Sequence, residues 1–579
     1  MGKNVAEQIV EMLVQAGIER IYAVAGDSLN ELNDAVRRNP KIKWIHVRHE
    51  EAGAYAAAAE AELKGLACCA GSSGPGHVHL INGLYDAHRS GAPVLAIAST
   101  CNTYEYGTGY FQETNPTKLF DDCSCYNYIA TTPAQVPRML QAAIQHAIHK
   151  KGVAVLGLPG DVTLMDAAEN ISSVHTYFTK ALIRPSDDEL QALSALINKH
   201  TKISIFCGIG AENAHDEVVQ MAATLKAPVG YTFRGKMSIQ HNNPYEVGMT
   251  GLLGLPSAYH SMHESDLVIM LGTDFPYVSF IPQEKTLVQI DTRPENLGRR
   301  AKLEMGLHGD IKVTLEALLP LLHNKTEDSF LNAQLQIYQK VKEHLNTYVE
   351  DKGIKGAIHP EFVAFELDKL ATDDAVFTVD TGMCCVWGAR YIHATGKRRM
   401  IGSWNHGSMA NALPHAIGAA LAFPGRQVVA MCGDGGISML LGDLATVKQY
   451  NLAIKLIVFN NYSLGMVKLE MEVAGLPDNQ TDMVNPDFAM VAEAMGFKGI
   501  TIDDPANLHA GLSVAFSYQE PVLVNVITDP NALAMPPKTE LKQIIGMAES
   551  MTKLMLGGKM NEVLDTVKSN YKHLKELLD

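Results

Sequence analysis

Two apolar runs, each followed at once by a polar motif, constrain the fold of this chain most strongly. Residues 427–432 form the first run and precede Gly433-Asp434-Gly435, and residues 453–459 form the second and precede Asn460-Asn461. Runs of this length and composition are typical of strands that are buried on both faces of a parallel sheet. Because open α/β sheets bind ligands at the carboxyl ends of their strands, both motifs are expected at one edge of a sheet.

The residue types in the two motifs indicate a site for a metal ion and a diphosphate. Glycines let backbone N–H groups come close to phosphate oxygens. Asp434 supplies a carboxylate oxygen and Asn461 an amide oxygen, and both are suitable ligands for Mg²⁺. Gly-Asp-Gly alone is also compatible with an ordinary turn, and it is the spaced asparagine pair that favours a binding site.

An alternation of strand-like runs and helical patterns occurs in three stretches of the chain, which predicts three doubly wound α/β domains with parallel sheets. We place the domains at residues 1–182, 183–333 and 334–530, and a C-terminal tail at residues 531–579. The other strand-like runs are residues 20–24, 44–47, 65–70, 93–98, 152–156, 203–206, 266–271, 286–290 and 375–379.

The bulk composition argues against several classes of protein. The net charge of −15 over 579 residues disfavours nucleic-acid binding. No run of 18 apolar residues is present, so the sequence predicts no membrane-spanning helix, and its start lacks the apolar region of a secretory signal. The nine cysteines are scattered without zinc spacing, and we expect them to be reduced thiols.

Five further motifs complete the pattern. They are Arg48-His49-Glu50-Glu51, Gly74-Pro75-Gly76, Phe111-Gln112-Glu113, Gly248-Met249-Thr250-Gly251 and Asn405-His406-Gly407-Ser408-Met409. With these motifs the chain resembles, essentially from end to end, the thiamine-diphosphate- and FAD-dependent pyruvate oxidases, and most of all the quinone-linked pyruvate dehydrogenase type. The resemblance implies the fold of thiamine-diphosphate enzymes, in which the pyrimidine-binding domain comes first, the FAD-binding domain second and the diphosphate-binding domain third.

Glu50 is the first candidate for a catalytic residue. It follows the strand-like residues 44–47 and precedes the alanine-rich residues 52–61, a position where an acidic residue also favours a helix N-terminus through the helix dipole. In the resembled family, the glutamate after the histidine activates thiamine diphosphate by sharing a proton with N1′ of its aminopyrimidine. The resemblance therefore implies this role for Glu50.

The resemblance also implies contacts of Phe111 and Gln112 with the cofactors, although Phe111 alone is also typical of a core aromatic residue. Glu470 lies nine residues after Asn461, where the acetohydroxyacid synthases that resemble this chain carry a tryptophan. A carboxylate there favours an oxidase, and a solvated helix charge is the alternative.

The resemblance implies two sets of cofactor-binding residues in the outer domains. The metal ligands are Asp434, Asn461 and the backbone carbonyl of Ser463. Met409 is either a core methionine or a bulky side chain that supports the bent cofactor. The residues implied to contact thiamine diphosphate are Gly74, Pro75, Gly76, Thr381, Gly382, Met383, Asn405, His406, Gly407, Ser408, Met409, Gly433, Asp434, Gly435, Gly436, Leu464 and Gly465.

The middle stretch has no Gly-x-Gly-x-x-Gly fingerprint, so an FAD site follows from the resemblance rather than from the residues themselves. Each implied residue is also compatible with an ordinary turn between a strand and a helix, and Arg234 is suited to a diphosphate. The residues implied to hold FAD are Gly208, Arg234, Thr250, Gly251, Leu252, Gly272, Thr273, Asp274, Asp291, Arg293, Asp310 and Ile311.

The C-terminal tail carries apolar residues at helical spacing, at positions 560, 563, 564, 567, 571, 574, 577 and 578. This pattern predicts an amphipathic helix, which either docks on the body of the protein or lies on a membrane surface. In the quinone-linked enzymes a C-terminal segment is released on reduction and binds lipid, so the resemblance implies a lipid bilayer surface as a partner.

Taken together, the resemblance implies oxidative decarboxylation of pyruvate to acetate and CO₂, with electrons passed through FAD to menaquinone or ubiquinone. It further implies thiamine diphosphate, Mg²⁺ and FAD as cofactors, a homotetramer, no nucleic-acid partner, and a cytoplasmic protein at the inner face of the cell membrane. Three alternatives stay open. They are a phosphate-dependent oxidase that makes acetyl phosphate and hydrogen peroxide, an acetolactate synthase, and a non-enzymatic lipid-binding or assembly protein.

Overall fold

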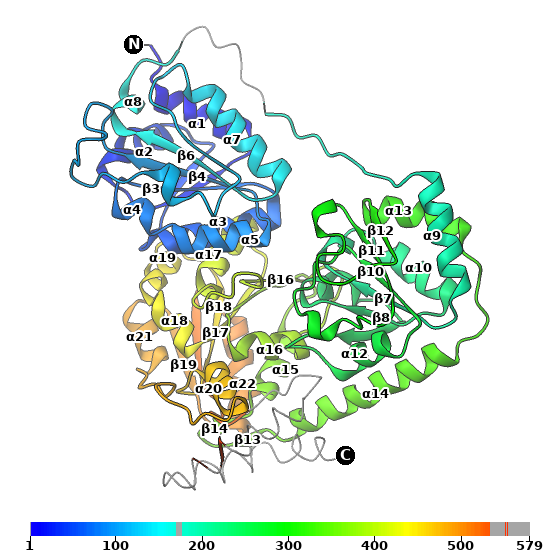
Figure 1. The fold of residues 1–579 in the computed structure, drawn as a ribbon. Coiled ribbons are helices and arrows are strands. Elements are labelled where there is room, and N and C mark those ends of the chain that lie inside the picture. The colour runs from blue at the N-terminus through cyan, green and yellow to red at the C-terminus, as the bar shows by residue number, and fades with distance from the viewer. Residues whose placement is uncertain (1, 169–175, 533–549, 552, 554–579) are drawn as a thin grey trace.

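Three six-stranded parallel sheets, each covered by helices, make up the body of the protein (Figure 1). The computed structural model describes residues 2–168, 176–532, 550, 551 and 553. The predicted fold class of three parallel-sheet α/β domains is confirmed, whereas the predicted tail helix lies outside the described residues. The domain limits given above stay predictions.

The first sheet has the strand order β2-β1-β3-β4-β6-β5. Its strands are β1 (Arg20–Ala23), β2 (Lys43–His46), β3 (Ala67–Gly71), β4 (Val94–Thr100), β5 (Tyr126–Ile129) and β6 (Val153–Pro159). Its helices are α1 (Val5–Gln15), α2 (Asn30–Arg38), α3 (Glu50–Lys64), α4 (Pro75–Val78), α5 (Ile81–Ser90), α6 (Pro116–Leu119), α7 (Val136–Lys150) and α8 (Gly160–Leu164).

The middle sheet has the strand order β12-β11-β10-β7-β8-β9. Its strands are β7 (Ile203–Cys207), β8 (Val229–Tyr231), β9 (Glu246–Met249), β10 (Leu267–Leu271), β11 (Thr286–Asp291) and β12 (Met305–His308). Its helices are α9 (Asp187–Lys199), α10 (His215–Leu225), α11 (Lys236–Ile239), α12 (Pro256–His263) and α13 (Ile311–Leu318). The long helix α14 (Ser329–Glu350) then leads to the third sheet.

The third sheet has the strand order β16-β15-β17-β18-β20-β19. Its strands are β15 (Val376–Val379), β16 (Arg399–Gly402), β17 (Val428–Gly433), β18 (Ile454–Asn460), β19 (Lys498–Ile502) and β20 (Val522–Ile527), and a hairpin of β13 (Gly353–Ile354) and β14 (Ala357–Ile358) precedes it. Its helices are α15 (Pro360–Leu370), α16 (Met383–Tyr391), α17 (Ala412–Ala422), α18 (Asp434–Met439), α19 (Leu444–Gln449), α20 (Gly465–Val473), α21 (Phe488–Ala494) and α22 (Pro505–Ser517).

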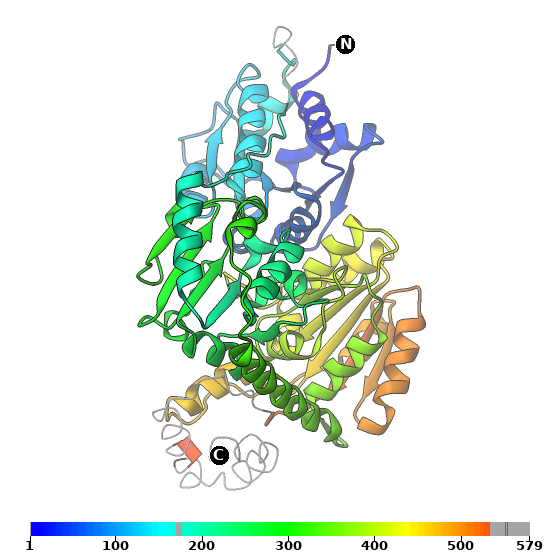
Figure 2. The same ribbon diagram turned by 90° about the vertical axis from the view of Figure 1, so that its right-hand side faces the viewer.

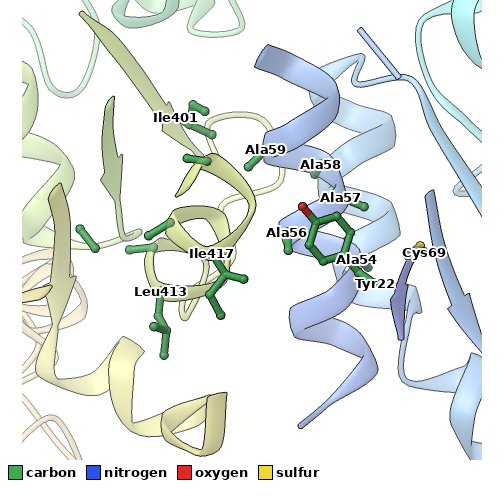
Figure 3. Packing of buried hydrophobic residues seen from close by; sticks show 14 of the residues in the cluster. Tyr22, Ala54, Ala56, Ala57, Ala58, Ala59, Cys69, Ile401, Leu413 and Ile417 are labelled. Carbon is green, nitrogen blue, oxygen red and sulfur yellow. The ribbon is translucent and has the colours of Figure 1, made fainter. Parts of the chain in front are cut away.

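The first and third domains meet through helices α3 and α17, and the middle domain stands beside them (Figures 1 and 2). All alanines of α3 except Ala52 lie in one buried cluster with Leu413 and Ile417 of α17 (Figure 3). A Cβ atom added to Gly418 would lie only 2.1 Å from the carbonyl oxygen of Ala56. The alanine-rich composition of α3 therefore follows from its burial between the first sheet and a second helix that approaches its backbone closely.

Among the described helices, none combines the length with the apolar character that a bilayer crossing requires.

We predict that Gly418→Ala destabilises the protein although alanine is the better helix former. The added methyl group has no room beside Ala56, and overpacking of this kind costs about 1–3 kcal/mol. The matched control is Gly388→Ala within α16, where the nearest atom is the Cγ1 of Val379 at 3.4 Å, an ordinary contact. Thermal unfolding should show a lower melting temperature for Gly418→Ala and an unchanged melting temperature for Gly388→Ala. Equal melting temperatures would contradict the packing argument.

Candidate functional site

The two polar motifs lie at the same edge of the third sheet, as the sequence predicts. Strands β17 and β18 are neighbours, and Gly433 is in register with Phe459. Asp434 and Asn461 therefore leave adjacent strands at their carboxyl ends. In the sheet order, β15 lies on the other side of β17 and the direction of the connections reverses between them. This reversal is where open α/β sheets form a crevice for ligands.

Asp434 is a buried carboxylate that a neighbouring amide holds in place. The residue is 3% exposed, and its Oδ2 accepts a hydrogen bond of 2.8 Å from the side-chain amide of Asn485. The same amide donates to Oδ1 of Asn460 at 2.9 Å. Burial raises the pKa of Asp434, while hydrogen bonds from the backbone of Gly435 and from Asn485 oppose this rise. Asn485 is absent from the residues predicted from the sequence.

The segment after β18 offers further oxygen atoms. The side-chain oxygen of Asn461 accepts from the backbone N–H of Ser463 at 3.1 Å, and Tyr462 between them has φ of +56°. Ser463 is buried, and its Oγ has no hydrogen-bond partner within the described part of the chain. A left-handed tyrosine is strained, and such strain is typical of ligand sites. Carboxylate, amide and hydroxyl oxygens together fit a hard divalent cation such as Mg²⁺.

Asp380 lies directly after β15 and was not predicted from the sequence. It is almost fully buried, and its Oδ1 accepts from the backbone N–H of Asn411 at 3.1 Å and from the side-chain amide of Asn411 at 3.2 Å. Burial raises the pKa of Asp380 to about 7. A Cβ atom on Gly436 would lie 1.7 Å from Oδ2 of Asp380, so no other residue fits at position 436.

The start of helix α16 forms an open cradle beside this carboxylate. Gly382 caps the helix with φ of +121°, and a Cβ atom there would meet nothing within 4 Å. Open space at a helix N-terminus suits a phosphate group, because unpaired backbone N–H groups point toward it. A Cβ atom on Gly465 would lie 3.1 Å from Nδ2 of Asn461 and 3.2 Å from Cγ of Met383. The cradle, the metal-ligand segment and the start of α20 therefore lie together.

Met409 reaches the same region from the segment before α17. A Cβ atom on Gly435 would lie 2.8 Å from Cδ2 of Leu464, 3.1 Å from Cε of Met409 and 3.4 Å from Sδ of Met483. Ala410, directly after Met409, has φ of +69°. Three flexible apolar side chains thus gather around Gly435, and Met483 among them was not predicted. Support of a cofactor by Met409 stays a prediction.

Glu50 lies in the first domain, at the first residue of α3. It is 7% exposed, and its Oε2 lies 3.0 Å from Nδ1 of His79. A Cβ atom on Gly76 would lie 2.4 Å from Oγ of Ser72 and 3.4 Å from Oε1 of Glu50. The predicted motifs around Glu50 and Gly76 therefore come together, because β2 and β3 both end at this edge of the first sheet.

The predicted Gly74 and Gln112 also meet at this edge. Gly74 has φ of +65°, and a Cβ atom there would lie 2.8 Å from the Cβ of Gln112. The hydroxyl of Ser73 donates to Oε1 of Gln112 at 3.2 Å, and Gln112 itself has φ of +59°. Phe111 is 75% exposed, so its interpretation as a core aromatic residue is wrong.

The segment 405–409 joins the first and third domains. The ring of His406 stacks on Tyr85 with centroids 5.5 Å apart, and its Nε2 lies 2.8 Å from Oδ1 of Asn82. The side-chain amide of Asn405 donates to the carbonyl of Arg89 at 2.8 Å. These contacts fix the segment against α5, so the side chains of Asn405 and His406 bind a protein surface within the chain.

Each strand of the middle sheet is followed by at least one residue predicted to bind FAD. Gly208 follows β7, Arg234 follows β8, and Thr250 to Leu252 follow β9. Gly272 to Asp274 follow β10, Asp291 and Arg293 lie at the end of β11, and Asp310 and Ile311 follow β12. All six strands are parallel, so these residues share one edge of the sheet.

Gly208 and Gly272 follow β7 and β10, the neighbouring strands between which the connections reverse. A Cβ atom on Gly208 would lie 2.4 Å from the carbonyl oxygen of Gly272, and Gly251 has φ of +108°. Oγ1 of Thr250 is buried and has no hydrogen-bond partner among the described residues. Glycine-containing loops at the point where the connections reverse, with an unpaired buried hydroxyl on the same edge of the sheet, fit a dinucleotide such as FAD.

The charged residues of this edge are engaged within the protein. Asp274 forms ion pairs with Arg299 and Arg300. Arg234 donates to the carbonyl of Ser90 in the first domain at 2.8 Å, and Asp310 caps α13. Burial raises the pKa of Asp291, which accepts from the backbone N–H of Arg293 at 2.8 Å.

The sequence matches the three domains of one known enzyme family. Residues 3–119 match the N-terminal TPP binding domain of thiamine pyrophosphate enzymes, residues 190–318 match the central domain, and residues 380–526 match the C-terminal TPP binding domain. The chain belongs to the thiamine pyrophosphate enzyme family. It is therefore an enzyme with thiamine-diphosphate-dependent chemistry of the decarboxylation type.

Three relatives illustrate the range of this family. The chain is 36% identical to the putative thiamine pyrophosphate-containing protein YdaP of Bacillus subtilis, over 95% of this chain and 96% of the relative. It is 31% identical to a pyruvate oxidase of Lactiplantibacillus plantarum, over 90% of this chain and 87% of the relative. It is 27% identical to the chloroplastic acetolactate synthase of Arabidopsis thaliana, over 92% of this chain and 82% of the relative.

We predict that Asn485→Ala weakens Mg²⁺-dependent binding of thiamine diphosphate by about 10- to 100-fold, the usual effect of losing a residue that orients a metal ligand. The side-chain amide of Asn485 holds Asp434, and its loss frees the carboxylate to turn away. The matched control is Asn479→Ala, an exposed asparagine on the same loop. Titration of cofactor-free protein with thiamine diphosphate at several Mg²⁺ concentrations measures both. Similar affinities for the two variants would refute the role of Asn485.

Proposed function

We propose that this enzyme oxidises pyruvate to acetate and CO₂ and passes the electrons through FAD to a membrane quinone such as menaquinone or ubiquinone. The overall reaction consumes pyruvate, water and quinone and yields acetate, CO₂ and quinol. The observation that carries the proposal is the second ligand edge in the middle domain, where Gly208, Gly272 and the unpaired hydroxyl of Thr250 suit a flavin. The pyruvate oxidase relative supports the choice of substrate.

Thiamine diphosphate supplies the nucleophilic carbon and the electron sink for decarboxylation, and FAD accepts the electron pair. The chain's own residues bind and orient these groups. Asp434 and Asn461, with the backbone carbonyl of Ser463, are proposed to hold Mg²⁺. Gly382 leaves room for the diphosphate, and Met409 is proposed to support the cofactor beside Gly435. Glu50 is proposed to hold the proton that it exchanges with the aminopyrimidine.

Glu50 and Asp434 lie in different domains, and among the described residues no hydrogen bond or ion pair joins them. We propose that they meet across a subunit interface, which makes a dimer the minimum assembly and a homotetramer the expected one. The exposure of Phe111 in the single chain supports this, because a large exposed aromatic side chain next to a ligand edge is typical of an interface.

The described residues of the tail support a link between the tail and the site. Oγ of Ser550 donates to the carbonyl of Leu476 at 3.0 Å, and Nζ of Lys553 donates to the carbonyl of Gly475 at 2.6 Å. Met551 packs against Leu469 on α20, the helix that carries the exposed Glu470. We propose that this docking is released on reduction, after which the tail binds the inner face of the cell membrane.

The decisive measurement is the flavin absorbance of anaerobic protein loaded with thiamine diphosphate, Mg²⁺ and FAD, before and after addition of pyruvate. We expect bleaching of the flavin band within the time of turnover, because pyruvate is then the electron donor. Glu50→Gln should bind the cofactors and bleach at least about 100-fold more slowly, since a positioned acid–base group contributes this much. An unchanged spectrum for the natural protein would refute the oxidase proposal.

The acetolactate synthase reading remains the second candidate, favoured by the relative in Arabidopsis thaliana. It predicts acetolactate from pyruvate with no net flavin reduction, so product analysis in the same experiment separates the two. A requirement for phosphate with formation of acetyl phosphate would identify the phosphate-dependent oxidase instead.

We predict that a chain truncated after Met535 keeps turnover with a soluble electron acceptor and loses its stimulation by phospholipid vesicles. The tail residues that dock near α20 are then absent, so neither docking nor membrane binding is possible. Paired assays with ferricyanide, with and without vesicles, measure both properties. The control is Lys553→Met, which removes one docking hydrogen bond and should raise vesicle-free turnover while lipid stimulation persists. An undiminished lipid response after truncation would refute the proposed role.

A further inference from the structure

The two carboxylate oxygens of Glu50 have different surroundings. Oε2 lies 3.0 Å from Nδ1 of His79, whereas Oε1 lies beside the position that a Cβ atom of Gly76 would occupy. A carboxylate oxygen accepts hydrogen bonds and an imidazole N–H donates them, so we assign the proton of this pair to Nδ1. The side chain of Glu50 is 9% exposed and that of His79 is 45% exposed. One oxygen is therefore fixed by a histidine N–H, and the other faces the glycine motif.

His79 is fixed both at its backbone and at its ring. Its backbone N–H donates to the carbonyl of Pro75 at 3.0 Å, at the end of α4. Its ring stacks on the ring of His49, with centroids 4.5 Å apart and planes inclined by 23°. His49 is itself fixed, because its Nδ1 accepts from the backbone N–H of Glu51 at 3.2 Å. The stack leaves the Nδ1 of His79 directed at Glu50.

A shared metal ion is a different explanation for this cluster, because His49, Glu50 and His79 offer ligand atoms that all lie within 4.8 Å of one another. The ring geometry disfavours it. An imidazole nitrogen binds a metal in the plane of its ring. Two rings stacked nearly in parallel cannot both direct their in-plane lone pairs at one ion between them. The arrangement is instead suited to a hydrogen bond from one ring and van der Waals support from the other.

We propose that His79 is a positioning residue for Glu50. Its Nδ1–H holds Oε2 and so leaves Oε1, which lies beside Gly76, to exchange a proton with the aminopyrimidine of thiamine diphosphate. The inference rests on the thiamine-dependent part of the proposed function and is independent of pyruvate, FAD and quinone. Without the hydrogen bond from His79, the Glu50 carboxylate would rotate. Misplacement of a catalytic group by about 1 Å costs about 100-fold in rate.

The choice of substitutions isolates the Nδ1 donor. The side-chain amide nitrogen of asparagine occupies the place of the histidine Nδ1, whereas that of glutamine lies one atom further out. We expect the rate of hydrogen exchange at C2 of the bound cofactor in His79→Asn to stay within about threefold of that in the natural protein. In His79→Ala and His79→Gln we expect this rate to fall by about 10- to 100-fold. His49→Ala removes the stacking ring and keeps the donor, so its loss should be smaller than that of His79→Ala.

Two readouts test the proposal on protein loaded with thiamine diphosphate and Mg²⁺, without pyruvate. The first is the rate of hydrogen–deuterium exchange at C2 of the bound cofactor. The second is a binding ratio, namely the affinity for thiamine diphosphate divided by that for the analogue in which N1′ is replaced by carbon. The natural protein and His79→Asn should show fast exchange and a high ratio, and His79→Ala should lose both.

Each outcome decides the matter. Retention of exchange rate and binding ratio in His79→Ala would overturn the proposal, and so would a loss in His79→Asn as large as that in His79→Ala, since the ring rather than the donor would then be responsible. Failure of the flavin to bleach with pyruvate, together with normal exchange, would refute the oxidase reading and leave the role of His79 standing. The two proposals can therefore fail separately.

Discussion

The close packing of α3 on α17 is the constraint on which the arrangement of the first and third domains within the chain depends. Gly418 places the backbone of α17 against the carbonyl of Ala56, an approach that a side chain would prevent. Helix α3 begins with Glu50, and α17 begins three residues after Met409, so one seam sets the position of residues from both domains. Hydrogen bonds from Asn405 and His406 to the first domain fix the relative orientation of the two domains, which the apolar contact alone does not specify.

The three sheets share the same topological feature. In each sheet the connections reverse between the first strand and a later neighbour, and the loops that leave there lie side by side. Glycines occupy the points at which such loops touch: Gly208 against Gly272 in the middle domain, and Gly436 against Asp380 in the third. A methyl group at these points would collide with backbone or carboxylate, so the glycines are required by the approach of the loops.

Sequence reasoning predicted the fold class and most interior strands, because these are continuous apolar runs. It did not predict five of the six edge strands, namely β5, β9, β12, β16 and β19. Most of these, such as Tyr126–Ile129, are only partly buried and lack such runs. Asp380 and Asn485 were missed for another reason. An acidic residue after a strand and an asparagine in a loop are common, and only the fold brings this pair to the predicted motif.

Two of the buried carboxylates, Asp434 and Glu50, are held in ways that suit the different roles proposed for them. Asp434 receives donors from the amide of Asn485 and the backbone of Gly435, which favour its charged form against the cost of burial. The metal-ligand role proposed for Asp434 needs a charged carboxylate, because a protonated carboxyl group binds a cation poorly. Glu50 instead has a histidine donor on Oε2, and Oε1 lies toward the glycine motif. A carboxylate fixed by one oxygen keeps its orientation while the other oxygen exchanges a proton, which is what an acid–base group requires.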